Sequence, residues 1–278
     1  MRAISLHPDV IVVTSRLLQT NCTILRGPVA PERSLGEDVS PALAETFVVD
    51  SPILPDELGL LPSLLEQARF PEPRGLLATH ADWDHLLARF PFPDATLGCA
   101  ESSAARLHAK PGAAQRELRA FDDELYIVRE APLALGAVQA LAVPGGCGIE
   151  EAELELYPAE GHTADGMAVW VPWARVLAVG DYLSSVEIPT ISAPEGIGAY
   201  LDTLERLRSL LARAEHVVPG HGPTIDGSSA LAVLAEDDAY LRSLRQRGSG
   251  AELPVGRRSR AQRELHAANV AILTGADR

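Results

Sequence analysis

Residues 80–85 (HADWDH) bring two imidazoles and two carboxylates together directly after the apolar run at 75–78 (GLLA). Imidazole nitrogens bind zinc, iron and other first-row metals, and carboxylate oxygens suit harder ions, so this stretch predicts metal ligands at the end of a strand. The alternative is that Asp82 or Asp84 caps a helix that begins at this point, with His80 and His85 in solvent. The residues downstream have to decide between these interpretations.

Three further potential ligands stand where apolar, strand-like runs end. His162 lies in the segment EGHT, Asp181 follows VLAVG, and His221 lies in VVPGHG. Functional side chains of α/β proteins gather at strand ends, and the neighbouring glycines let the backbone come close to a bound ion or substrate. The chain therefore carries four ligand-bearing motifs in similar settings.

In order and spacing, these motifs resemble the ligand series of the metallo-β-lactamase fold superfamily. That series is His-x-His-x-Asp-His, then Gly-His-Thr, Gly-Asp and a Gly-His near the C-terminus, and the match runs from about Asp9 to Pro223. The resemblance implies an α/β fold of the α+β type, a four-layer αβ/βα sandwich. Two mixed sheets would lie face to face, with helices outside and a metal site at one sheet edge.

The resemblance also implies a role for each ligand position. His80 and His162 would hold a first metal ion, and Asp181 would bridge it to a second. The residues that would hold the second ion are Asp84, His85 and His221. Asp82 departs from the family pattern, which has a histidine there. Two divalent ions are expected, with zinc (Zn²⁺) as the first choice. A carboxylate is a harder ligand than an imidazole, so Asp82 makes Fe or Mn further options.

The activity that the resemblance implies is hydrolysis by a metal-bound hydroxide, with Asp84 orienting the hydroxide or taking up its proton. We expect a small ester, thioester or lactone as substrate, in chemistry similar to that of hydroxyacylglutathione hydrolase. Two alternatives stay open: an iron-dependent oxidoreductase of the same fold, and a non-catalytic metal-binding member. Tyr182, beside Asp181, is a candidate to donate a hydrogen bond to a substrate oxyanion, although a structural role is favoured.

Composition indicates a globular protein, with 46% hydrophobic and 22% charged residues in 278. We expect a single domain over residues 1–278, with C-terminal helices from about residue 228. The net charge of −14 argues against a broad nucleic-acid or anionic-membrane surface and favours a small-molecule substrate. Nothing in the composition indicates the oligomeric state.

The three cysteines are odd in number and widely spaced, which favours reduced, mostly buried thiols over a disulfide framework. Without a leader-like segment or an apolar run of about 18 residues, a cytoplasmic protein with no membrane partner is expected. Four histidines outside the motifs are expected to be surface or packing residues: His7, His108, His216 and His266.

Local patterns predict alternating strands and helices over 46–109 and mainly strands over 125–179, followed by three helices around 200–214, 229–245 and 258–273. Residues 26–45 are expected to form a long polar loop, 121–124 a polar connection, 125–128 a strand, and 144–146 a break between strands. Four arginines are interpreted as an exposed helix start: Arg257, Arg258, Arg260 and Arg263.

Overall fold

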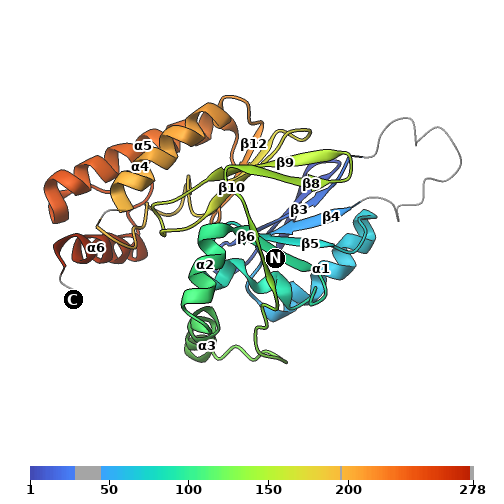
Figure 1. Ribbon diagram of the computed structural model, residues 1–278. Helices are drawn as coiled ribbons and strands as arrows, with labels where there is room; N and C mark the ends of the chain where they lie inside the picture. Colours follow the sequence, from blue (N-terminus) through green and yellow to red (C-terminus); the bar gives the residue numbers. More distant parts are fainter. Residues whose placement is uncertain (29–44, 195, 276–278) are drawn as a thin grey trace, which may run out of the picture.

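The computed structural model describes residues 1–28, 45–194 and 196–275. Within these ranges the strands form two mixed sheets (Figure 1). The larger sheet holds, in spatial order, β1 (Arg2–His7), β2 (Val10–Thr14), β3 (Asn21–Arg26), β4 (Thr46–Val49), β5 (Gly75–Ala78), β6 (Thr96–Ala100) and β7 (Val138–Leu141). The smaller sheet holds β12 (His216–Val218), β11 (Val176–Ala178), β10 (Met167–Val171), β9 (Ala152–Pro158) and β8 (Gly145–Ile149).

The pairing of neighbouring strands changes once within each sheet, between antiparallel and parallel. In the larger sheet β1 to β4 pair antiparallel and β4 to β7 pair parallel, while in the smaller sheet only β11 and β12 are parallel. Parallel neighbours need crossover connections, which helices supply. These are α1 (Pro55–Ala68) between β4 and β5, α2 (Glu101–Ala109) and α3 (Ala113–Leu125) between β6 and β7, and α4 (Gly196–Leu211) between β11 and β12.

The central strands are apolar on both faces because each sheet is covered on both sides. In β2, Val10 and Val12 pack between the two sheets, whereas Ile11 and Val13 pack against the helices of the first half. A third apolar cluster joins the smaller sheet to α4, α5 (Gly227–Arg247) and α6 (Arg260–Thr274). Three apolar layers separate four structural layers, which confirms the predicted αβ/βα sandwich.

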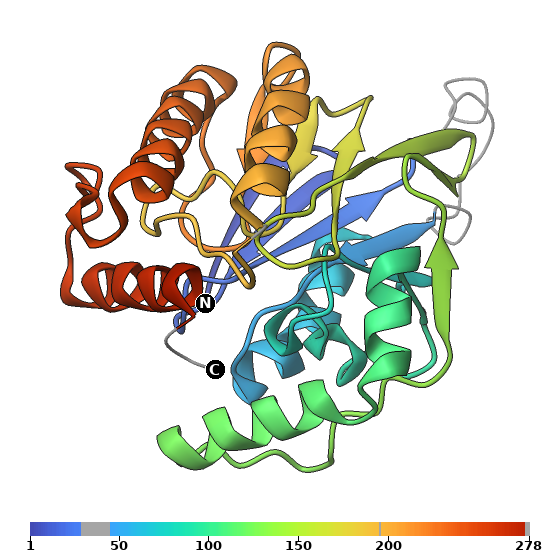
Figure 2. The ribbon, with the colours of Figure 1, turned by 60° about the vertical axis from the view of Figure 1, so that its left-hand side comes forward.

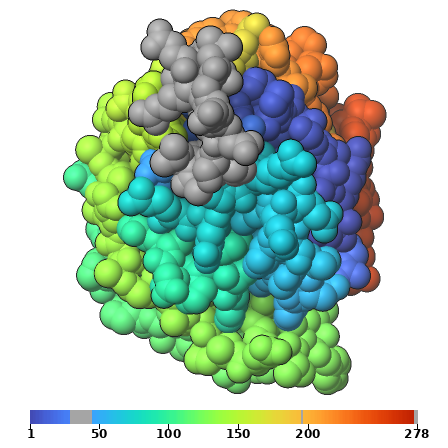
Figure 3. All heavy atoms as spheres, turned by 90° about the vertical axis from the view of Figure 1, so that its right-hand side faces the viewer, coloured from blue at the N-terminus to red at the C-terminus, as the bar shows by residue number. Residues whose placement is uncertain are grey.

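The views show this order of layers directly. Helices α1 to α3 lie on one side of the strands and α4 to α6 on the other (Figures 1 and 2). On the face drawn in Figure 3, residues from the first half of the chain cover most of the surface, and the C-terminal residues appear along the top and one edge.

Helix α3 replaces a predicted connection and strand. The expected polar connection at 121–124 and the expected strand at 125–128 were both wrong, because residues 113–125 form one helix. Ala114 and Leu118 are four residues apart, so they share one face of the helix, and that face is buried. Many charged residues on the other faces hid this short apolar stripe.

Two edge strands also escaped prediction. Strand β1 is largely exposed and pairs with β2, and β8 begins at Gly145, inside the segment 144–146 that was expected to be a break. Edge strands pair on one side only and have little apolar character to mark them. Of the predicted loop at 26–45, residues 29–44 lie outside the described residues. No helix within the described ranges combines the length and the apolar character needed to cross a membrane.

Candidate metal centre

All seven predicted ligand residues follow strand ends and lie at one edge of the sandwich. Residues 80–85 follow β5 of the larger sheet, whereas His162, Asp181 and His221 follow β9, β11 and β12 of the smaller sheet. Two groups bring three ligand atoms each within 4.8 Å of one another. The first group is His80, His162 and Asp181, and the second is Asp84, His85 and His221.

Asp181 lies between the two groups. Its Oδ2 atom is 3.3 Å from Nε2 of His162 in the first group and 3.3 Å from Nε2 of His221 in the second. Its Oδ1 atom is 3.2 Å from Nε2 of His85. One carboxylate therefore reaches donors of both groups, which is the position that a bridging ligand would need.

Two histidines are oriented by backbone carbonyls. The Nδ1 atom of His162 is 3.3 Å from the carbonyl oxygen of Thr190, and that of His221 is 2.9 Å from the carbonyl oxygen of Leu18. A carbonyl can only accept a hydrogen bond, so Nδ1 carries the proton in both rings. The lone pair of Nε2 is then directed towards the site, as a metal ligand requires.

Asp50 orients the other two histidines, directly or through Thr79. Its Oδ2 atom is 3.0 Å from Nδ1 of His85 and accepts a hydrogen bond from Oγ1 of Thr79 at 2.9 Å. Because the hydroxyl proton of Thr79 is used in this way, Oγ1 is left to accept from Nδ1 of His80 at 3.2 Å. Asp50 was missed in the sequence, where its only signal is a carboxylate directly after the apolar run of β4.

The buried atoms that point into the site fit a metal ion. In the described part of the chain, Nε2 of His80, Nε2 of His85 and Oδ1 of Asp181 are buried and have no hydrogen-bond partner. Buried polar atoms are rarely left unpaired, because their desolvation is costly. Imidazole nitrogens and carboxylate oxygens in groups of three form a donor set for zinc, iron or manganese.

The electrostatics of the site favour positive charge. Burial lowers the pKa of His221, but the negative charges of Asp181 and Asp84 outweigh it and raise that pKa to about 10. Burial likewise opposes charge on Asp181, yet the neighbouring His221, His85 and His162 hold its pKa well below the usual range. The proton on His221 is thus bound strongly at a position where a divalent cation would compete with it.

The segment 80–85 does not use its carboxylates as helix caps. The helix expected from Asp84 onwards is replaced by two short 3₁₀ turns, η3 (Trp83–His85) and η4 (Leu87–Arg89). Asp82 precedes the first turn, but its side chain makes no capping hydrogen bond. Its Oδ2 atom lies 3.4 Å from Nε2 of His80 and 3.6 Å from Nε2 of His162, so the carboxylate faces the first group.

Tyr182 supports the site from behind. Its side chain is 2% exposed and packs against Tyr200, with ring centroids 4.4 Å apart and the rings tilted by 46°. Its hydroxyl accepts a hydrogen bond from the backbone N–H of His162 at 3.1 Å. These contacts agree with the structural role that was favoured over contact with a substrate.

Among the histidines, arginines and cysteines that were expected to lie outside the site, one expectation fails. None of the four histidines outside the motifs belongs to either group of ligands within the described residues. The expectation that Arg257 marks an exposed helix start was wrong, because its side chain is 2% exposed and pairs with Asp237. Cys22 and Cys99 are buried free thiols, as expected, and Cys147 is partly buried.

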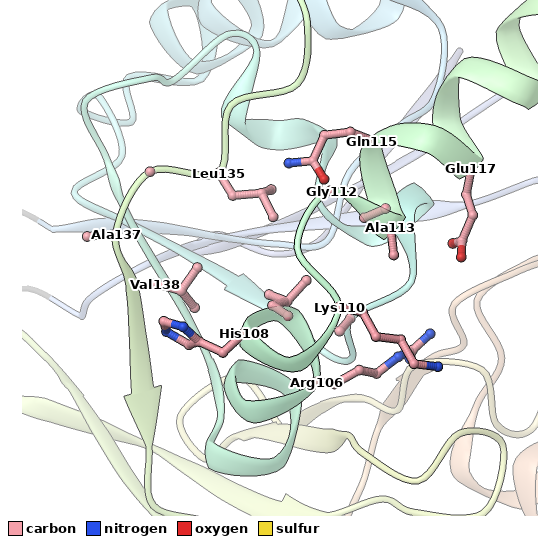
Figure 4. Close-up of a pocket in the computed structure, with 14 residues that line it drawn as sticks. Arg106, His108, Lys110, Gly112, Ala113, Gln115, Glu117, Leu135, Ala137 and Val138 are labelled. Atoms are coloured by element: carbon pink, nitrogen blue, oxygen red, sulfur yellow. The ribbon is translucent and has the colours of Figure 1, made fainter.

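A cavity of about 340 Å³ lies beside the ligand segment, between α2, α3 and the approach to β7. Ala81, the neighbour of His80 and Asp82, forms part of its wall together with Arg106 and Lys110 of the α2 region. In Figure 4 the Arg106 and Lys110 side chains run in the same direction, and His108 points to the opposite side. The cavity and the metal centre therefore share one wall.

Curated relatives match short parts of the chain. A "Beta-lactamase-like protein 2 homolog" from Caenorhabditis elegans is 32% identical over 93 residues, which is 34% of this chain and 28% of that protein. A "Metallo-beta-lactamase type 2" from Bacillus sp. (strain 170) is 31% identical over 80 residues, 28% of this chain and 31% of that protein. The chain spans under a third of the length of either relative.

Solved structures extend the similarity over the fold. A metallo-beta-lactamase family protein from Thermus thermophilus has a TM-score of 0.61 at 21% identity, covering 86% of this chain and 83% of that one. A beta-lactamase domain protein from Burkholderia ambifaria has 0.62 at 19%, covering 98% and 88%. A sec-alkylsulfatase from Pseudomonas sp. has 0.66 at 13%, covering 98% and 50%.

The family profile described as "Metallo-beta-lactamase superfamily" matches residues 65–221, more than half of the chain. That range includes all seven of the predicted ligand residues, and the two-sheet sandwich agrees with the similar solved structures. The chain belongs to the metallo-beta-lactamase superfamily.

Proposed function

We propose that this protein is a metal-dependent hydrolase of a small ester, thioester or lactone. The observation that carries the proposal is the pair of ligand groups joined by Asp181, in which each group offers nitrogen and oxygen donors within 4.8 Å. Divalent ions held in this way supply Lewis acidity and lower the pKa of water, so that a nucleophile is available near neutral pH. The ligand roles of the seven residues are part of this proposal.

Asp84 is the residue that we assign to proton handling. It is 8% exposed, and its Oδ2 atom lies 3.4 Å from Nε2 of His221 and 3.7 Å from Nε2 of His85. A carboxylate in this place can orient an attacking water and hold the proton that the water loses. Its backbone is held by Ser51, whose hydroxyl donates to the carbonyl oxygen of Asp84 at 2.9 Å.

The substrate class follows from charge. A net charge of −14 repels polyanions such as nucleic acids, whereas small acyl compounds with little charge are not excluded electrostatically. We therefore propose a small-molecule substrate with an acyl carbon as the centre of attack, and no nucleic-acid partner. Chemistry of the hydroxyacylglutathione hydrolase type falls within this class.

The position of Asp82 supports a second candidate, an iron-dependent oxidoreductase. Its carboxylate oxygen faces His80 and His162, where the usual family pattern supplies a third imidazole. An added hard oxygen donor shifts metal preference from zinc towards iron or manganese. Redox chemistry at iron would then replace hydrolysis.

Metal analysis combined with a substrate panel distinguishes the two candidates. Protein purified without added metal is analysed for zinc, iron and manganese, then stripped, reloaded and assayed with esters, thioesters, lactones and phosphodiesters. For the hydrolase, we expect turnover of an acyl substrate that disappears on stripping and returns with metal. Asp84→Asn should lower kcat by about 10²-fold or more, as loss of a general base does. Asp94→Asn, at an exposed turn, is the matched control.

Two results would contradict the hydrolase. Acyl turnover that survives complete metal removal would separate the activity from the proposed centre. Coloured, iron-bearing protein that consumes oxygen and hydrolyses no acyl substrate under any metal would favour the oxidoreductase instead.

A further inference from the structure

The two oxygens of Asp82 have different partners. Oδ2 faces the first ligand group, 3.4 Å from Nε2 of His80 and 3.6 Å from Nε2 of His162. Oδ1 turns away from that group and accepts a hydrogen bond from Nη2 of Arg106 at 2.5 Å. The carboxylate is therefore held at one oxygen while the other stays directed at the site.

Arg106 comes from a different element than Asp82. It lies on α2, and its side chain is 31% exposed. Besides Nη2 to Asp82, it donates Nη1 to Oδ1 of Asp165 at 2.8 Å. One planar group thus binds two carboxylates through separate nitrogens.

Asp165 connects the guanidinium of Arg106 to the backbone of the segment that carries His80 and Asp82. Its side chain is 2% exposed, and its Oδ2 atom accepts a hydrogen bond from the backbone N–H of Ala81 at 3.0 Å. Asp165 lies three residues after His162, and Ala81 lies between His80 and Asp82. The Asp82–Arg106–Asp165 chain therefore ties together two of the three segments that supply the first ligand group, those of His80 and His162.

We propose that Arg106 is a positioning residue that holds Asp82 as a ligand of the first metal site, presenting Oδ2 and occupying Oδ1. The inference rests on the metal centre of the proposed function and deepens it. It explains how a carboxylate can stand where the family pattern has an imidazole. Among the described residues, the hydrogen bonds of Arg106 go to Asp82 and Asp165 and to no member of the second ligand group, so the metal affinity of that group serves as an internal reference.

The chemistry of the guanidinium suits this role better than any other cation. Its donors form a rigid fork that can meet two carboxylates at once, and its charge offsets the negative charge that Asp82 adds to the site. A lysine ammonium would keep the charge but has no fixed fork. The positions of the partners, and not charge alone, are what the arginine supplies.

The test measures Zn²⁺ affinity by competition with a chromophoric chelator, step by step for the two sites. His162→Ala and His221→Ala identify which step belongs to which ligand group. Arg106→Met should weaken the first step by about 10- to 100-fold, the usual effect of removing the partner of a metal ligand, and leave the second step within about threefold. Arg242→Met, an exposed arginine paired with Asp238, is the matched control and should change neither step.

A second set of variants, made in Asp82→His protein, distinguishes a positioning role of Arg106 from a role in folding. In Asp82→His protein no carboxylate remains at position 82 for Arg106 to hold, so adding Arg106→Met should leave the first-site affinity unchanged or higher if Arg106 acts through Asp82 and not through Asp165. The visible spectrum of Co²⁺-loaded protein gives an independent signature, because Arg106→Met should alter the first-site bands and preserve those of the second site. Thermal unfolding of the metal-free variants shows that both remain folded.

Three results would overturn the proposal. In the first, Arg106→Met binds Zn²⁺ at the first site as tightly as the wild type. In the second, Arg106→Lys has the full first-site affinity. In the third, Arg106→Met weakens the first-site affinity by the same factor whether position 82 is Asp or His. These results leave the metal centre intact and refute only the role of Arg106. If the wild-type protein binds no metal at either step, the proposed function fails together with the inference.

Discussion

His221 shows at the scale of a single residue how the site is prepared for a cation. Its Nδ1 proton is directed at Leu18, and its Nε2 atom faces Asp84 and Asp181. Those carboxylates raise the pKa of His221 to about 10, so in metal-free protein the ring is protonated at neutral pH. A metal ion must displace that proton before it can bind.

We therefore predict that metal affinity rises with pH through the range below 10. Acidification stabilises the protonated, metal-free form, and the raised pKa places this competition above pH 7 and not near the usual value for histidine. Calorimetric titration of Zn²⁺ in buffers of different ionisation enthalpy should show net proton release at pH 7. His7→Gln, outside both ligand groups, is the control, and binding without proton release would contradict the prediction.

Sequence reasoning picked out the predicted ligand side chains but not their partners. The seven predicted ligand residues stand in short motifs beside glycines or strand ends, and the structure brings all of them close together. Asp50, Arg106 and Asp165 act through contacts between segments 24 to 84 residues apart, which no local pattern records. Their roles could be read only once the fold placed them beside the histidines.

Among the elements, the segment from Ser184 to Ile191 depends on the C-terminal helices. The buried Arg257 donates Nη1 to the carbonyl oxygens of Ser184 and Glu187, at 3.1 and 2.8 Å, and pairs with Asp237 of α5. Helix α6 adds Gln262 and Asn269, which accept hydrogen bonds from the backbone N–H groups of Ile188 and Ile191. The same segment carries Thr190, the partner of His162.

We predict that Arg257→Met destabilises the metal-free protein by about 3–5 kcal/mol, because it leaves a buried carboxylate at Asp237 unpaired. Combining it with Asp237→Leu should recover much of the loss, since neither charge is then buried alone. Urea unfolding measures both variants, with Arg242→Met on the exposed face of α5 as the control. Equal stability of Arg257→Met and wild type would show that the pair does not hold the segment.

Element prediction succeeded where burial leaves a strong pattern. The apolar run at 75–78, which was predicted as a strand, agrees with β5 to the residue, because a strand covered on both faces is a continuous apolar run. Helix α3 failed because only a narrow face packs inward, and β1 and β8 failed because most of their side chains are exposed or half-buried. Their identity depends on neighbours that are distant in the sequence.

For the molecule as a whole, the candidate metal centre draws residues from two halves of the chain. His80, Asp84 and His85 follow a strand of the larger sheet, and His162, Asp181 and His221 follow strands of the smaller one. Ions bound between them would connect layers that otherwise meet through apolar packing. Ligands that bind only the folded state stabilise it according to their concentration relative to Kd.

We predict that removing metal with a chelator lowers the Tm by about 10 °C, the shift expected when free metal at about 1,000 times Kd contributes roughly 4 kcal/mol. Differential scanning calorimetry with and without chelator measures the shift, and Asp181→Asn should reduce it because Asp181 reaches both groups. Asp94→Asn is again the control. A Tm that is independent of chelator would show that the ions do not connect the halves.

The hydrogen bond from Nδ1 of His221 to the carbonyl oxygen of Leu18 spans 203 residues of sequence. Leu18 precedes β3, whereas His221 follows β12, the last strand in the described part of the chain. A growing chain therefore cannot complete this centre until β12 has joined the smaller sheet. Uptake of the second metal ion would then report that the first strands and β12 have come together.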